Sequence, residues 1–302
     1  MMTTTKMRED GRSFDPMRPE TSLSLKKAAI DRELGRLLPR RGPAVVRAMR
    51  YAVLPGGKRF RPLLVMASGA CFGARQSVLL PFACALELIH SYSLVHDDLP
   101  AMDNDDFRRG RPSCHKAFGD GWALLAGDGL LTLAFEVMAS ARVPAAQRAA
   151  KDEAIVAVSR RAGVEGMIGG QWLDISLVPD KLTRRAMDVI SFKKTGSLIQ
   201  GAVEAGALLG RAGAAGRCAL ADYGRNLGLA FQVRDDIMDA GGGADGGRPR
   251  RPDHTALRGL AGARLRLARL VGEAVSSIDR FRERGAELRY LAISLLNTAA
   301  GE

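Results

Sequence analysis

Aromatic side chains are scarce in this chain of 302 residues, in which Phe, Trp and Tyr together make up 5 % of the residues. Sheets draw on aromatic and β-branched side chains, whereas the plentiful Ala, Leu and Gly allow helices to pack closely. The hydrophobic content of 46 % is enough for a sizeable core. The composition therefore argues against a sheet-rich fold and favours an all-α one.

Cysteine occurs only four times and never in Cys-x-x-Cys spacing. Each cysteine lies in or beside an apolar segment, which is typical of reduced, buried thiols in a cytosolic protein. Neither a zinc site nor a disulfide framework is therefore expected. The four residues are Cys71, Cys84, Cys114 and Cys218.

Targeting signals and long apolar runs are also missing. The N-terminal residues contain no apolar signal core, and their acidic side chains argue against a transit peptide. No uninterrupted apolar run has the length needed to span a bilayer. We therefore expect a cytoplasmic protein without an integral membrane segment.

Basic residues outnumber acidic ones by 45 to 33, and the formal net charge is +12. Such a charge suits an anionic partner such as a nucleic acid, a lipid surface or a phosphorylated metabolite. The arginine-rich stretch 248–289 lacks interleaved aromatics that would stack on bases, so a solvated basic face is favoured there. No nucleic-acid partner is expected.

The chain divides into a short arm and a long helical region. Residues 1–20 show no amphipathic period and are expected to be a disordered arm, whereas 21–302 are expected to form a single domain. Gly and Pro separate most of the segments of helical length, and no strand-period run or fixed repeat competes. This pattern predicts an all-α fold, with one large helical bundle around a central apolar cavity. The expected helices are 22–38, 43–53, 60–72, 77–98, 121–141, 147–165, 183–194, 196–211, 215–239 and 256–280.

One apolar helix ends in a dense group of acids. The segment 82–98 is almost wholly apolar up to Asp97 and Asp98, Pro100 then stops the helix, and three more aspartates follow before residue 107. Carboxylates at a helix C-terminus face the negative end of the helix dipole and repel one another, so a cation must compensate. Oxygen ligands without cysteine indicate Mg²⁺ or a similar ion. Three arginines follow at once, as a metal-bound phosphate requires.

A second acidic cluster repeats this arrangement at the end of another mostly apolar helix. Asp235 and Asp239 are four residues apart and share one helix face, with Asp236 between them. Either cluster alone is equally well interpreted as a solvated helix end or a cap. Two such clusters in one chain favour a paired metal site.

Three further elements are candidates for binding anions. The stretch Gly56–Pro62 places three cations around a glycine turn that opens a helix, where backbone N–H groups also favour a phosphate. Lys193–Gly196 is weaker, because a basic helix end with a glycine cap explains it equally well. His90 lies seven residues before Asp97, and a lone histidine on an apolar helix is more often a hydrogen-bonded core residue than a ligand.

Taken together, these residues resemble the trans-prenyl diphosphate synthase family, particularly the bacterial farnesyl diphosphate synthases and their geranylgeranyl relatives. The resemblance extends from about Met49 to Asp239. The matching motifs are Gly56-Gly57-Lys58-Arg59-Phe60-Arg61-Pro62, the run from Glu87 to Asp103, Arg108-Arg109-Gly110, Gly169-Gly170-Gln171, Lys194-Thr195-Gly196 and the second aspartate cluster.

The resemblance implies a role for each matching residue. Its catalytic set comprises Asp97, Asp98, Asp103, Asp235, Asp236, Asp239 and Lys194, of which Asp97, Asp103, Asp235 and Asp239 would hold about three Mg²⁺ ions against the allylic diphosphate. Arg108 and Lys194 would also contact that substrate, Lys58, Arg61, His90 and Arg109 would bind isopentenyl diphosphate, and Thr195 and Gln232 would be further substrate-binding residues. Tyr92, with the small Ser93 beside it, would limit product length.

The implied reaction joins an allylic diphosphate to isopentenyl diphosphate. Magnesium would neutralise the charge on the departing diphosphate, and apolar helices would keep water from the allylic cation. The expected product is farnesyl diphosphate (C15), with a geranylgeranyl diphosphate (C20) synthase as the alternative. The resemblance also implies a homodimer.

The segment after Asp239 departs from the family pattern. The resemblance implies two Gly-Lys pairs before a Thr-aromatic-Pro turn, whereas Gly241–Pro252 is rich in glycine and arginine and is expected to be a mobile lid or a disordered insert. This departure keeps open a non-catalytic partner subunit of another prenyl synthase, although the intact aspartate clusters count against it. A terpene cyclase is disfavoured, because Gly56–Pro62 and Arg108–Arg109 would serve a second diphosphate.

Overall fold

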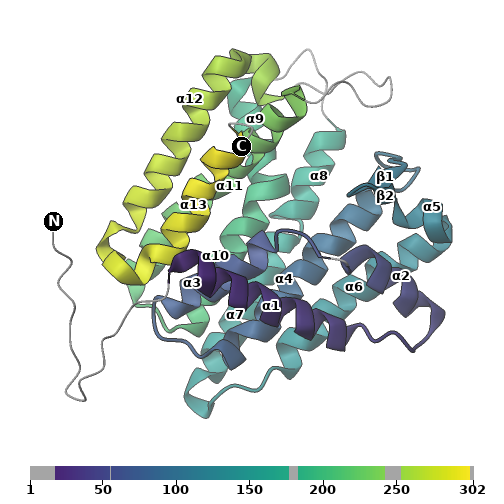
Figure 1. Ribbon diagram of the computed structural model, residues 1–302, viewed down its shortest axis with the longest axis horizontal. Coiled ribbons are helices and arrows are strands. Elements are labelled where there is room, and N and C mark those ends of the chain that lie inside the picture. Colours follow the sequence, from purple (N-terminus) through teal and green to yellow (C-terminus); the bar gives the residue numbers. More distant parts are fainter. Residues whose placement is uncertain (1–17, 55, 177–182, 242–252, 300–302) are drawn as a thin grey trace.

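Helices make up nearly all of the described chain in this computed structural model (Figure 1). The structure describes residues 18–54, 56–176, 183–241 and 253–299. The helices are α1 (Pro19–Leu37), α2 (Ala44–Val53), α3 (Phe60–Ala70), α4 (Gln76–Asp97), α5 (Cys114–Phe118), α6 (Asp120–Ser140), α7 (Arg148–Ala162), α8 (Met167–Ile175), α9 (Arg184–Ser191), α10 (Ser197–Leu209), α11 (Ala214–Gly241), α12 (His254–Ser277) and α13 (Ala286–Ala299). Short turns are η1 (Ala145–Gln147), η3 (Phe192–Gly196) and η4 (Asp279–Gly285).

The predicted all-α class is confirmed, and each of the ten expected helices overlaps an observed one. The expectations missed α5, α8 and α13, and they also missed a hairpin of β1 (Phe107–Arg108) and β2 (Arg111–Pro112). Strands of two residues are too short to show an alternating pattern, so no period could reveal them. Most residues of the expected N-terminal arm and of the expected lid lie outside the described residues.

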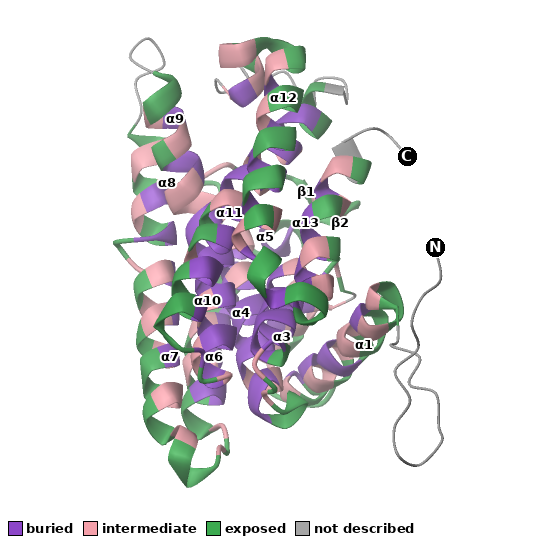
Figure 2. Cartoon of the chain, turned by 90° about the vertical axis from the view of Figure 1, so that its left-hand side faces the viewer, coloured by how far each residue is buried: buried purple, intermediate pink, exposed green. Residues whose placement is uncertain are grey.

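The core is built around α4, α10 and α3, where buried residues concentrate (Figure 2). Helix α4 is apolar on every side because neighbouring helices surround it, among them α3 and α6. Helices α11, α12 and α13 run side by side, and the Tyr223 hydroxyl of α11 donates to the Leu288 carbonyl of α13 at 2.8 Å.

Helices α9 and α10 form one continuous rod rather than two helices separated at Gly196. The connecting turn η3 is π-helical, a local widening that is often found at functional sites. A Cβ atom on Gly228 of α11 would lie 2.5 Å from the Gly196 Cα atom, so both glycines are needed for this close crossing. The crossing brings Lys194 and Thr195 next to the acidic part of α11.

The cysteines are buried as predicted, except for Cys218. Burial raises the pKa of Cys71 to about 12 and that of Cys114 to about 11. The expectation was wrong for Cys218, which lies on the outward face of α11 near its start.

Two helices, α4 and α6, have the length and hydropathy of a membrane-spanning helix. Burial of 72 % of the apolar window of α4 explains its composition as that of a core helix. Only 39 % of the corresponding window of α6 is buried, so this helix leaves apolar side chains at the surface.

Candidate active site

The first acidic cluster forms where α4 ends. Asp97 is the last residue of α4, and the loop turns back so that the Asp103 backbone N–H donates to the Asp97 carbonyl at 2.8 Å. Burial, together with the nearby Asp103 and Asp98 carboxylates, raises the pKa of Asp97 to about 6, although Lys194 and Arg108 oppose this rise. The sequence predicted that carboxylates would crowd together at this helix end, and the raised pKa of Asp97 agrees with that prediction.

Asp98 holds an arginine in place. Its buried carboxylate accepts a hydrogen bond from Arg108 Nε at 3.0 Å, and Arg108 Nη2 reaches Asp105 at 3.0 Å. Arg108 and Arg109 lie on the β1–β2 hairpin, whose two-residue turn has positive φ at Arg109 and Gly110. The hairpin is anchored to α2, because the Tyr51 hydroxyl donates to the Pro112 carbonyl at 2.7 Å.

The second acidic cluster occupies the last turns of α11. Asp235 pairs with its neighbour Arg234, and Asp239 is exposed near the helix end. Asp236 is buried, and its two oxygens accept hydrogen bonds from Gln232 Nε2 at 2.8 Å and from the His254 backbone N–H at 2.9 Å. Burial raises the pKa of Asp236 to about 6. Asp236 therefore ties helices together, whereas Asp235 and Asp239 share another face of α11.

Turn η3 connects the two clusters. Lys194 Nζ lies 2.7 Å from Asp174 Oδ2 of α8, and its charge acts on Asp97. The Thr195 hydroxyl donates to Gln232 Oε1 at 2.7 Å. Lys194 is thus near the first cluster, and Thr195 contacts the helix that carries the second.

A separate cationic region lies around Arg61, His90 and Arg109. Burial lowers the pKa of Arg61 to about 10, although Glu87 and Asp235 oppose the shift. Burial and the nearby guanidinium groups, that of Arg61 first among them, lower the pKa of His90 well below its usual value. The imidazole is therefore neutral at pH 7, and the buried positive charges there suit a polyanionic ligand.

The three cations of the Gly56–Pro62 stretch have different environments. Lys58 is exposed, and Arg61 is buried 5.5 Å from the centroid of the Phe231 ring. Arg59 is fully buried in a left-handed backbone conformation, where it pairs with Glu87 at 2.5 Å and with Asp31 at 2.8 Å. Its guanidinium is therefore an anchor for the loop, which leaves Lys58 and Arg61 for a ligand.

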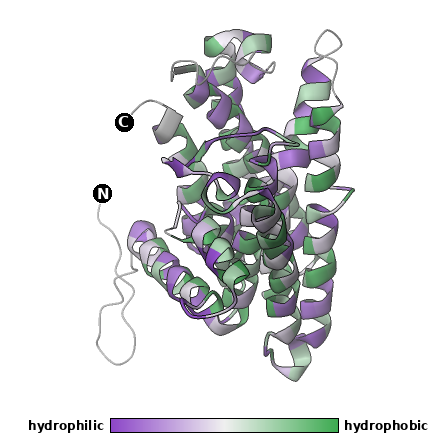
Figure 3. Cartoon of the chain, turned by 90° about the vertical axis from the view of Figure 1, so that its right-hand side faces the viewer, coloured by the Kyte–Doolittle hydropathy of each residue, from purple (hydrophilic) through white to green (hydrophobic). Residues whose placement is uncertain are grey.

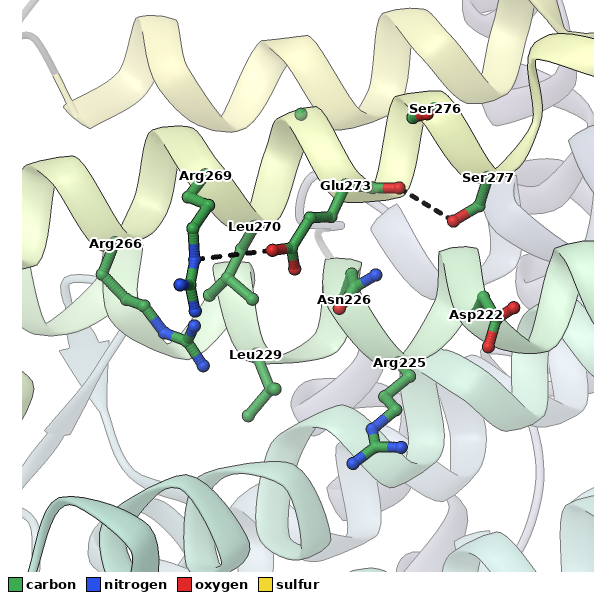
Figure 4. Close-up of a pocket in the computed structure, with 11 residues that line it drawn as sticks. Asp222, Arg225, Asn226, Leu229, Arg266, Arg269, Leu270, Glu273, Ser276 and Ser277 are labelled. Carbon is green, nitrogen blue, oxygen red and sulfur yellow. Dashed lines mark hydrogen bonds and ion pairs between the residues drawn. The ribbon is translucent and has the colours of Figure 1, made fainter.

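Of two hollows in the described structure, one is lined by predicted site residues and the other is not. A pocket of about 130 Å³ is lined by residues that include Gly56, Asp98, Arg108 and Arg109. An open groove of about 770 Å³ between α11 and α12 contains none of the predicted site residues (Figure 4). Of these two hollows, the pocket of about 130 Å³ is therefore the one that adjoins predicted site residues.

Residues 43–253 match a protein family described as polyprenyl synthetase. The chain belongs to this family. It is 42 % identical over 285 residues to the farnesyl diphosphate synthase of Geobacillus stearothermophilus, which covers 90 % of this chain and 95 % of that relative. It is also 42 % identical over 265 residues to the farnesyl diphosphate synthase of Escherichia coli strain K12, with 84 % of this chain and 88 % of the relative covered.

The fold agrees with this membership. The crystal structure of an FPP/GFPP synthase from Zymomonas mobilis has a TM-score of 0.83 to this chain at 38 % sequence identity. The match covers 92 % of this chain and 98 % of that one. The family resemblance predicted from the motifs is confirmed.

The donor atoms of the two clusters suit magnesium. All of them are carboxylate oxygens, and the described ranges contain no three His, Cys, Asp or Glu side chains that converge closely enough to hold a metal ion alone. Mg²⁺ is commonly bound through one or two carboxylates together with waters and substrate phosphates. Two separate clusters of acids therefore fit ions that are completed by a diphosphate.

Tyr92 is buried one turn and a half before Asp97 on α4. Its ring packs edge-on against His96 at 5.7 Å, and its hydroxyl has no hydrogen-bond partner among the described residues. Burial raises the pKa of this phenol to about 12. The Ser93 hydroxyl donates to the His90 carbonyl at 2.9 Å, so it is satisfied within its own helix.

Two residues of α8 lie beside the predicted site: Asp174, which was not singled out from the sequence, and Gln171, which was part of a matching motif but was given no role. Asp174 pairs with Lys194, and Gln171 has buried side-chain nitrogen and oxygen atoms without a partner in the described chain. Both lie on α8, which was not expected as a helix. The signal was the Gly169-Gly170-Gln171 motif, since a Cβ atom on Gly170 would lie 2.2 Å from the Lys194 backbone nitrogen.

Proposed function

We propose that this chain is a short-chain trans-prenyltransferase that condenses isopentenyl diphosphate with dimethylallyl or geranyl diphosphate to give farnesyl diphosphate. The observation that carries the proposal is the division of the site into two fields of opposite charge. Asp97 and Asp103 lie at the end of α4, and Asp235 lies in the last turns of α11. Arg61, His90 and Arg109 lie in the cationic region, where Asp235 acts on Arg61. The farnesyl diphosphate synthases among its relatives support the product class.

Each field suits one substrate. Asp97, Asp103, Asp235 and Asp239 would bind the Mg²⁺ ions, for which the resemblance implies about three, and Arg108 and Lys194 would bind the allylic diphosphate beside them. Bound Mg²⁺ supplies charge neutralisation to the departing diphosphate. Lys58, Arg61, His90 and Arg109 would bind isopentenyl diphosphate. Thr195 and Gln232 join η3 to α11, so they would keep Lys194 aligned with the acids.

The reaction follows from this placement. The bond between the allylic carbon and oxygen breaks, and the diphosphate leaves with the electron pair. The alkene of isopentenyl diphosphate then supplies two electrons to the allylic cation, a new carbon–carbon bond forms, and loss of a proton restores a double bond. The departing diphosphate is the base that the family resemblance implies, and the apolar walls of the bundle exclude water.

The direct test is to incubate the purified chain with Mg²⁺, isopentenyl diphosphate and each allylic starter, and to identify the products by mass. We expect farnesyl diphosphate from dimethylallyl or geranyl diphosphate, and no product in EDTA. A chain that forms no condensation product with any starter would instead support the non-catalytic partner subunit.

The separation of the two diphosphates predicts different effects on the two Michaelis constants. Arg61→Ala should raise the KM for isopentenyl diphosphate about 10- to 100-fold, because a charged hydrogen-bond donor is lost from a buried site. The KM for geranyl diphosphate should change much less. Arg264→Ala, which removes an exposed arginine of α12, is the matched control and should change neither constant. Equal effects of Arg61→Ala on both constants would contradict the division.

We also propose that the protein is a homodimer in the cytoplasm. Large apolar side chains are exposed on α6, on α8 and at Val156 of α7. Figure 3 shows hydrophobic segments on helices at the surface of the molecule. Trp172 is 66 % exposed and Leu125 is 57 % exposed, and an apolar surface of this kind is typical of an interface between protein chains. The cytoplasmic location rests on the cysteine pattern. A monomer in solution would contradict the homodimer.

A further inference from the structure

Several hydrogen bonds hold the start of α12, although a glycine-rich stretch precedes this helix in the sequence. Asp253 caps the helix, and its carboxylate accepts hydrogen bonds from the Ala256 backbone N–H at 2.8 Å and from the Thr255 hydroxyl at 2.6 Å. His254 is the first helical residue and is completely buried. The first backbone N–H groups of a helix have no partner within it, so they are available to other groups.

The backbone N–H of His254 is used by the second acidic cluster. It donates to Asp236 Oδ2 at 2.9 Å, while Gln232 donates to the other oxygen of the same carboxylate at 2.8 Å. Gln232 in turn accepts from the Thr195 hydroxyl at 2.7 Å. Asp236 is therefore held from both sides, and a chain of hydrogen bonds runs from the turn that carries Lys194 to the start of α12.

The side chain of His254 fastens α12 to α9. Its Nε2 atom lies 3.1 Å from the Ser191 hydroxyl, whereas its Nδ1 atom, 3.8 Å from Asp188 Oδ1, has no hydrogen-bond partner in the described chain. Asp188 is also near Arg258 at 3.4 Å and near Arg266 at 3.3 Å, the latter at the edge of the groove in Figure 4. The position of the His254 backbone N–H is thus set by contacts on both sides of the helix start.

We propose that the backbone N–H of His254 is a positioning group for the second aspartate cluster. Asp236 lies between Asp235 and Asp239 in the last turns of α11, where the final carbonyl groups lack intrahelical partners and a helix tends to fray. By holding Asp236, His254 fixes the rotation of this turn and directs the carboxylates of Asp235 and Asp239 toward the allylic diphosphate. The inference rests on the proposed function.

A proline at position 254 removes the donor and leaves the helix start intact. Proline is favoured at the first helical position, and Asp253 has φ −127° and ψ −177°, which is the extended conformation that a residue before proline adopts. His254→Pro therefore loses the N–H and the imidazole, whereas His254→Ala loses the imidazole alone. A comparison of the two variants isolates the hydrogen bond to Asp236.

The readout is the melting temperature of each variant with inorganic diphosphate and increasing Mg²⁺, followed by steady-state kinetics. Loss of a group that hydrogen-bonds to a metal ligand typically lowers the affinity for the metal by about 10- to 100-fold. We expect His254→Pro to need about 10-fold more Mg²⁺ than His254→Ala for half of the thermal shift, and to have a higher KM for geranyl diphosphate. The two variants should have the same KM for isopentenyl diphosphate.

Equal Mg²⁺ requirements of the proline and alanine variants would overturn the inference. If His254→Pro does not fold, the Mg²⁺ requirement of Asp236→Asn tests the inference instead. The amide of this variant can accept a hydrogen bond from only one of the two N–H donors. An unchanged Mg²⁺ requirement in Asp236→Asn would also overturn it. The wild-type chain separates the two proposals, since a wild type that binds Mg²⁺ and diphosphate but forms no product contradicts the proposed function alone.

Discussion

Asp97→Asn is expected to lower the rate of condensation by about 100-fold or more, because it would remove a charged ligand of the proposed Mg²⁺ ions that stabilise the leaving diphosphate. The substitution keeps the size of the side chain, so the bundle should remain folded. Steady-state rates at saturating Mg²⁺ measure this effect. Asp235→Asn should behave in the same way.

The same variant should be more stable than the wild type in EDTA at neutral pH. The pKa of Asp97 in the folded chain is about 6, above the ordinary value of 3.8. The folded state therefore binds the proton more tightly, and the ionised carboxylate destabilises the fold at pH values above about 6. The expected gain for Asp97→Asn is on the order of 1–3 kcal/mol at about pH 8, and it should vanish as the pH falls to about 4.

Asp106→Asn is the matched control. Asp106 is exposed in the loop after α4 and pairs with Lys116 at 2.9 Å, so its loss should leave the rate of condensation unchanged. Near-normal turnover of Asp97→Asn would show that this carboxylate is not a metal ligand.

Tyr92→Ala is expected to shift the main product from C15 to C20 or longer, while the dependence on Mg²⁺ stays the same. A side chain five residues before Asp97 lies about 7.5 Å along the helix axis from the acidic cluster, in the direction in which a growing tail must extend. The ring is buried and its hydroxyl lacks a partner among the described residues, as expected for a wall of an apolar cavity. Ser93 is small, so Tyr92 would limit the length nearly alone. Product masses from geranyl diphosphate measure the shift.

Tyr92→Phe separates the ring from its hydroxyl. The phenylalanine variant keeps the bulk, so it should still stop at C15, and loss of a buried, unsatisfied hydroxyl should not destabilise the chain. Unaltered products from Tyr92→Ala, or a wild type that already makes C20, would mean that another residue sets the chain length.

Local patterns in the sequence were sufficient for the fold class and for the two acidic clusters. Helical periods and Gly or Pro boundaries depend on neighbouring residues, so ten helices could be located without a structure. Elements without such a signal were missed, among them α8 and the β1–β2 hairpin. The acidic ends of α4 and α11 were recognisable because adjacent carboxylates are unfavourable unless a ligand compensates for their charge.

The roles of individual residues within the motifs were decided by the tertiary structure. Arg59 and Arg61 are two residues apart, yet Arg59 is bound by Glu87 and Asp31 while Arg61 lies beside Phe231. Likewise Asp236 accepts an N–H from α12, whereas Asp235 on the same turn pairs with Arg234. The sequence by itself determined which kinds of residue gather at each helix end. Only the packing of distant helices determined which oxygen meets which donor, because a hydrogen bond depends on distances of a few tenths of an ångström that no local pattern specifies.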